Sequence, residues 1–192
     1  LHALAVLEEF PAAEWADDDR LLPPPRSFRE LVAARHAACS APARALVDAA
    51  AVLGVRCALP VAVRLAGAPD PLAALEEAEQ AELLDVPDPA HPRVVAFPHP
   101  LVRTAVYEAL AAVQRARLHG AAAALLAGSD QATVLRHRIA ATPGEDPALA
   151  RDLLAFAERE AATGAWPSAA WIFSTIWRVV RAGATGRCHT RP

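Results

Sequence analysis

The sequence contains no lysine, no asparagine and no methionine, so all 19 basic residues are arginine. A P-loop needs a lysine whose ammonium reaches the terminal phosphates, and Schiff-base catalysis needs a lysine amine. These 192 residues can therefore hold neither an ordinary Walker A site nor a Schiff-base enzyme. Because the first residue is Leu1, we expect a fragment of a longer product, a processed product, or a translation from a misplaced start.

Strong charge of either sign, long apolar runs and paired cysteines are also missing. A net charge of −3 argues against a strongly basic surface for nucleic acids. No apolar run reaches the roughly 18 residues that a membrane span needs, and the N-terminus lacks the basic start of a secretory signal. Cys39, Cys57 and Cys188 form no C-x-x-C pair. We therefore predict no zinc site, no membrane association and a reducing, cytoplasmic location.

Alanine, leucine, arginine and glutamate dominate the chain, and these residues favour helix. The 17 prolines, with polar capping residues and glycines, mark where helices begin and end. We therefore predict a mainly α fold. The predicted helices are a tail at 1–10, one after Ser27, one from Ser40 to Gly54, and others at 59–66, 70–83, 100–110, 115–127, 131–142, 147–163 and 165–182.

Several helix ends carry specific capping signals. Ser27 followed by Glu30 predicts a capping box. Ser40 and Asp70 stand before prolines of the first helical turn and predict N-caps. Gly67 predicts the end of the short helix at 59–66.

One segment, R-V-V-A-F at 93–97, is a strong strand candidate. Residues 83–86 are a short partner for it, which predicts one β-hairpin. Three short helices followed by a two-stranded wing is the order of a winged helix. The helices that come after the hairpin predict further helical pairs.

The stretch VAFPHPLVRTAVYEALAAVQRARL at 95–118, followed by His119, resembles the F-x-H-P-L-V-R-x-A-V-Y…R-x-x-L-H stretch of large ATP-binding regulators of the LuxR family, which are STAND/AAA-type signal-transduction ATPases. Three further blocks agree. PPPRSFRELVAARHAACSAPARALVDAAAVLG resembles the lid helices and the entry to the winged-helix domain. DPLAALEEAEQAELL resembles the helix before the wing, and AEREAATGAWPSAAWIF resembles the first tetratricopeptide-like repeats. The resemblance covers about 1–180.

The resemblance implies a domain order. Residues 1–26 would end an ATPase lid region, 27–128 would form a winged-helix-like domain, 129–182 would begin a helical-repeat region, and 183–192 would be a frayed tail. The parent protein would bind ATP or ADP with Mg through an N-terminal ATPase core. It would sense an unknown inducer and bind DNA through a C-terminal helix-turn-helix effector.

By this resemblance, the chain is the coupling segment of a nucleotide-switched transcriptional regulator. It would contact the ATPase core and the effector, with no catalytic activity and no cofactor of its own. Trp166, Trp171 and Trp177 would pack between repeats, and exposed copies of them would favour self-association.

Two alternatives remain. Some members of this family carry a nucleotide cyclase as effector, and the sequence does not distinguish a parent with a cyclase from a parent with a DNA-binding effector. A stand-alone DNA-binding winged helix is the second alternative, but the helix before the wing, at 70–83, has five acids and no base. Phosphate repulsion argues against insertion of this helix into a groove.

His99 and Arg103 are the candidate nucleotide-sensing residues of the parent. Related switch ATPases place a histidine just after the wing, where it contacts the β-phosphate of ADP, and the aspartate that usually follows is Pro100 here. Arg103 lies one helical turn later and could share that face. The alternatives are that His99 caps the helix or pairs with a backbone carbonyl, and that Arg103 is a solvated surface arginine.

Two other clusters are expected to be surface features. Arg115, Arg117 and His119 form a basic group that we expect on a solvated or interdomain face. The glutamates of 76–82 lack histidine partners at ligand spacing, and we expect them on a solvated face. No serine lies in G-x-S-x-G, so no nucleophile–base–orienter set is predicted.

Overall fold

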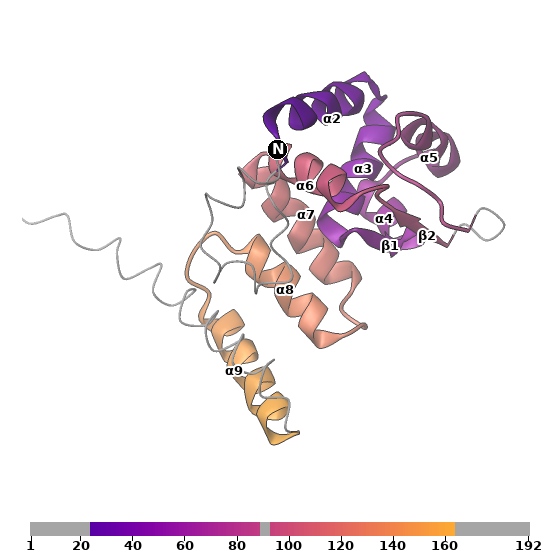
Figure 1. Ribbon diagram of the computed structural model, residues 1–192. Helices are drawn as coiled ribbons and strands as arrows, with labels where there is room; N and C mark the ends of the chain where they lie inside the picture. The colour runs from indigo at the N-terminus through magenta and orange to yellow at the C-terminus, as the bar shows by residue number, and fades with distance from the viewer. Residues whose placement is uncertain (1–23, 89–92, 164–192) are drawn as a thin grey trace, which may run out of the picture. The chain divides into compact units, whose positions relative to one another are not determined.

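The computed structural model describes residues 24–88 and 93–163 (Figure 1). The helices predicted at 1–10 and 165–182, the tail at 183–192 and the three C-terminal tryptophans lie outside the described residues. In the part that is described, eight helices and one two-stranded antiparallel sheet make the fold mainly helical, as predicted.

The chain divides into two compact units between Ala111 and Ala112. The first unit contains α2 (Arg26–Ala38), α3 (Ala41–Leu53), β1 (Arg56–Ala58), α4 (Leu59–Ala66), α5 (Pro71–Gln80), β2 (Val94–Ala96) and α6 (Pro100–Ala109). The second contains α7 (Ala112–Leu125), α8 (Gln131–Ala141) and α9 (Pro147–Ala162). Helix α7 thus groups with α8, whereas we placed it in the domain 27–128. The roles given to the four predicted domains, from the lid region to the tail, stay predictions.

Most of the predicted helix ends are confirmed. The Ser40 hydroxyl accepts a hydrogen bond from the Ala43 N–H, and the Asp70 carboxylate accepts one from the Ala73 N–H at 3.1 Å. Helix α4 ends at Gly67, whose φ of 64° lies in the left-handed region that glycine adopts without strain.

The capping box predicted at Ser27 is wrong. Helix α2 begins at Arg26, and its N-cap is Pro25, two residues before the predicted cap and without a side-chain bond. The carboxylate of Glu30 instead accepts a hydrogen bond from the Arg26 guanidinium at 2.8 Å. In a capping box this carboxylate would accept a hydrogen bond from the backbone N–H of Ser27, but here it is engaged in the i, i+4 ion pair with Arg26. Ser27 itself lies inside the first turn of the helix.

The predicted hairpin is only partly correct. Residues 94–96 form β2, but the segment 83–86 contributes a single bridge, between Asp85 and Ala96. The main partner of β2 is β1, with Cys57 opposite Val95 in an antiparallel register that the sequence analysis missed. R-C-A is too short to show the alternation that marks a strand.

Helix α5 ends before Leu83, although the prediction extended it to that residue. Glu82 has a φ of 55°, so the chain leaves the helix in a left-handed turn. The N–H groups of Leu83 and Leu84 both bond the Ala78 carbonyl, at 3.0 and 3.3 Å. The turn directs both leucines into the core, where neither is exposed to solvent.

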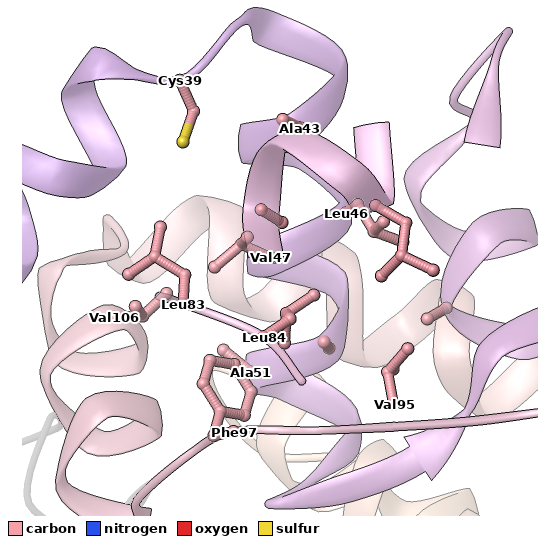
Figure 2. Packing of buried hydrophobic residues seen from close by; sticks show 14 of the residues in the cluster. Cys39, Ala43, Leu46, Val47, Ala51, Leu83, Leu84, Val95, Phe97 and Val106 are labelled. Atoms are coloured by element: carbon pink, nitrogen blue, oxygen red, sulfur yellow. The ribbon is translucent and has the colours of Figure 1, made fainter. Parts of the chain in front are cut away.

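Helix α3 lies at the centre of the first unit and packs against α4, α5, α6 and β1. Figure 2 shows its buried side chains among those of the neighbouring elements. Its middle is buried around almost the whole circumference, from Leu46 to Val52. Leu46, Leu84 and Val95 pack together from three different elements. Burial of a leucine of this kind contributes about 1.5–3 kcal/mol. The core of the first unit is therefore built around one buried helix, α3.

The second unit joins its helices by two different interfaces. Leu149, Leu153 and Ala157 of α9 pack on Leu135 of α8 in a small apolar cluster. Helix α7 also packs on α8, but its buried residues are two alanines and His119. No helix within residues 24–88 and 93–163 has the length and apolar character that crossing a bilayer requires.

Candidate switch site at the start of α6

The predicted site lies where the chain passes from β2 into α6. Phe97 is buried, and its N–H donates to the Val55 carbonyl at 2.9 Å, which extends the pairing of the sheet by one residue. Pro98 and His99 are exposed to solvent, and Pro100 begins the helix. A buried anchor and a proline start therefore fix the position of His99.

His99 is the N-cap of α6. Its Nδ1 accepts a hydrogen bond from the Leu101 N–H at 3.1 Å, and its carbonyl accepts from the Val102 N–H at 2.9 Å. Acceptance at Nδ1 requires the lone pair there, so a neutral ring carries its proton on Nε2. The capping alternative for this histidine is confirmed, and the exposed Nε2–H is the donor that a ligand would meet.

Arg103 is half-buried, and its guanidinium reaches α3. Its Nε donates to the Ala51 carbonyl at 2.8 Å, across 52 residues of sequence, and the guanidinium lies 4.9 Å from the centre of the Tyr107 ring. Ala51 is in the last turn of α3, where carbonyls lack partners within the helix and attract positive charge. The alternative of a solvated surface arginine is therefore wrong, because the guanidinium bonds α3 and lies beside Tyr107.

The structure does not bring His99 and Arg103 onto one binding face. The imidazole turns back to cap its own helix, whereas the guanidinium crosses to another helix. A phosphate held between the two side chains would require both to leave these partners. Their nucleotide-sensing role in the parent stays a prediction.

A second polar pair joins α2 to α3 and was missed by the sequence analysis. His36 Nε2 lies 2.8 Å from Asp48 Oδ1, and the carboxylate is almost wholly buried. The signal was present, because Asp48 is the one charged residue in the apolar stretch A-L-V-D-A-A-A. A buried carboxylate needs such a partner. The pair connects α2 to α3, whereas α2 packs mainly against α6.

The described cysteines are not activated as nucleophiles. The Cys39 thiol donates to the Arg35 carbonyl at 3.4 Å, and burial raises its pKa. Burial also raises the pKa of Cys57 to about 11. The thiolate is the reactive form, so both thiols are slow to react at neutral pH.

The acidic cluster of α5 is only partly a solvated face. Glu77 bonds both the N–H and the hydroxyl of Ser40, with 2.6 Å to the nitrogen, and thereby caps α3 from outside. Glu82 pairs with Arg35 at 2.8 Å. The prediction of a solvated face is wrong for Glu77, which is half-buried against the start of α3, whereas Glu82 stays exposed in its surface ion pair.

The basic cluster of α7 also differs from the prediction. Arg117 is exposed, but His119 is buried, and its Nδ1 lies 2.8 Å from Nδ1 of the buried His137 on α8. No group of three or more histidine, cysteine or acidic side chains within residues 24–88 and 93–163 is arranged to hold a metal ion.

Comparison of the sequence with protein-family models and with curated proteins, and of the structure with solved structures, finds no match. The functional argument therefore rests on the residues and their geometry.

Proposed function

We propose that this chain is the coupling segment of a nucleotide-switched transcriptional regulator of the LuxR type, working in the cytoplasm without an ATPase or DNA-binding site of its own. The hydrogen bond from Arg103 to the Ala51 carbonyl carries the proposal. It connects the helix that follows the wing to the inner helix of the first unit. A ligand that shifts the start of α6 would thus act on α3.

The position of His99 supports this role. An exposed imidazole at the N-terminus of α6 lies where helix N–H groups and the helix dipole favour an anion. Only one turn separates it from Arg103. A β-phosphate brought to His99 by an ATPase core would therefore act close to the connection with α3.

The order of elements agrees with the proposed winged-helix-like architecture. Helices α3, α4 and α5 precede the Asp85–Ala96 bridge and β2, and β1 adds a strand beside β2. In the second unit, α8 and α9 pack as an antiparallel pair, with Arg138 bound to Asp152 at 2.6 Å and Arg159 bound to Gln131. Helical-repeat proteins are built by stacking such pairs. These features support a repeat region after the wing.

The stand-alone DNA-binding alternative is less well supported. Helix α5, which precedes the wing, reads P-L-A-A-L-E-E-A-E-Q and has no basic residue. Acidic side chains at this position would repel phosphates in a groove. Salt-dependent binding of the chain to duplex DNA would support this alternative against our proposal.

ADP binding to the full-length gene product tests the proposal. We expect His99→Ala and His99→Asn to weaken ADP binding about equally, by roughly tenfold, the loss of one charge-assisted hydrogen bond. Asparagine keeps a good N-cap, so the pair separates a lost cap from a lost phosphate contact. Unchanged ADP affinity in both variants would overturn the sensing role. Formation of a cyclic nucleotide by the full-length product would favour the cyclase alternative.

A further inference from the structure

The second unit contains a buried pair of histidines that the proposed function does not use. His119 on α7 and His137 on α8 approach with their Nδ1 atoms 2.8 Å apart, and their rings are tilted by 44°. Two nitrogens bound to one tetrahedral zinc ion at its usual distances would be about 3.3 Å apart. The observed contact is a hydrogen bond, in which one Nδ1 donates and the other accepts.

This bond limits how many protons the pair can hold. With both rings neutral, complementary tautomers satisfy the contact, and one added proton still leaves a donor facing an acceptor. When both rings are charged, two N–H groups face each other at 2.8 Å, which is repulsive. The folded pair therefore holds at most one extra proton, whereas the unfolded chain binds two in acid.

The surroundings of the pair also oppose protonation. On α8, the residues one turn from His137 are Thr133, Val134, Ala140 and Ala141, all uncharged. On α7, the charged residue one turn from His119 is Arg115, which is a cation. On α9, which packs against the other side of α8, Asp152 is bound to Arg138, and Arg159 is bound to Gln131. Burial lowers the pKa of His137.

Helix α7 packs closely on α8 through small residues on either side of the pair. Its buried side chains besides His119 are Ala122 and Ala123, and Gly120 lies against Ala141. The imidazole bond is thus enclosed in a close helix–helix interface, where repulsion between two charged rings cannot be relieved while α7 stays on α8. The apolar cluster of α8 with α9 is separate and has no titrating member.

We propose that the His119–His137 pair is an acid-sensitive latch that holds α7 on α8 at neutral pH and releases it in acid. A histidine whose folded pKa is depressed stabilises the fold above its unfolded pKa, near 6.5, and this stability is lost as the pH falls. The opening constant of α7 from α8 rises about tenfold per pH unit for each proton that only the open form binds.

Amide hydrogen exchange of the full chain, read by mass spectrometry between pH 7.5 and 5 and corrected for intrinsic rates, tests the latch. We expect protection of α7 and α8 to fall about tenfold per unit below about pH 6.5. Peptides of α4 and α5, which lack histidine, are the internal control and keep their protection. Protection of α7 and α8 that does not vary with pH would overturn the proposal.

Matched variants connect the effect to the pair. In the double variant His119→Asn, His137→Asn, the side-chain amides take the places of the two Nδ1 atoms and keep a donor–acceptor bond. Amides do not titrate, so we expect the acid response to disappear. The single variant His119→Asn guards against misfolding of the double one. Its amide can bond either form of His137, so no two N–H groups face each other and the response falls well below tenfold per pH unit. An acid response of wild-type size in either folded variant would show that the pair is not the latch.

Discussion

Glu77 and Ser40 cap the N-terminus of α3 together, although 37 residues separate them. The carboxylate accepts hydrogen bonds from the Ser40 N–H and hydroxyl, and the hydroxyl in turn accepts from the first turn of α3. A negative charge at this end also complements the helix dipole. These hydrogen bonds lower the pKa of the Glu77 carboxyl.

The first prediction concerns Glu77→Gln. A carboxyl whose folded pKa is lowered stabilises the fold above its unfolded pKa, and that contribution is lost as the pH falls. We expect the variant to melt below the wild type at pH 7, with the difference shrinking toward pH 3. Thermal melts across this range are the measurement. Glu79→Gln, an exposed residue of the same helix, is the control and should show no such convergence.

The second prediction concerns the connection between α6 and α3. Arg103→Met keeps a long side chain beside Tyr107 but leaves the carbonyl of the buried Ala51 without this donor. We expect a loss of about 1–3 kcal/mol in the free energy of unfolding, measured by urea titration. Arg64→Met at the exposed end of α4 should change it by less than about 0.5 kcal/mol. Equal effects at the two sites would contradict a structural role for Arg103.

A third prediction tests the inner helix. Leu46→Ala removes a fully buried side chain and should cost about 2–5 kcal/mol of unfolding free energy. Leu72→Ala makes the same chemical change on α5, where 64% of the residue is exposed, and should cost little. Urea denaturation of both variants gives the comparison, and a large loss at Leu72 would indicate a different packing of α5.

The fourth prediction concerns thiol reactivity. Because burial raises the pKa of Cys57 to about 11, its thiolate fraction at pH 8 is about a hundredfold below that of an ordinary thiol. In a Cys188→Ser variant, alkylation by iodoacetamide should be slow in the folded chain and fast in urea. Peptide mapping assigns the label to Cys39 or Cys57. Rapid labelling of Cys57 in the folded chain would show that β1 is open to solvent.

Features that depend on neighbouring residues could be predicted from the sequence. The cap at Asp70 and the left-handed glycine at Gly67 follow from residue types within one turn. The capping box at Ser27 failed within the same distance, because Glu30 had a competing partner in Arg26. A local signal is therefore reliable only where a single arrangement satisfies the groups involved.

Features that depend on distant residues were not predictable from one sequence. The pairing of β1 with β2 joins residues about 40 positions apart, and the bond from Arg103 to Ala51 spans 52. Nothing in R-C-A or in H-P-L-V-R specifies these partners. The start of α6 at Pro100 was thus predictable, but the direction of the Arg103 side chain was not.

The crowding of alanines on α3 has a genetic consequence. Four of the eight buried positions of this helix are alanine, and three of these four belong to the core cluster of the first unit. Every single-base change in an alanine codon that alters the residue introduces serine, threonine, proline, valine, glycine or an acid. Only glycine is smaller, and it weakens a helix. We therefore expect this inner helix to tolerate the fewest single-base changes, and a mutational scan that scores each codon of the first unit would find its lowest tolerance there.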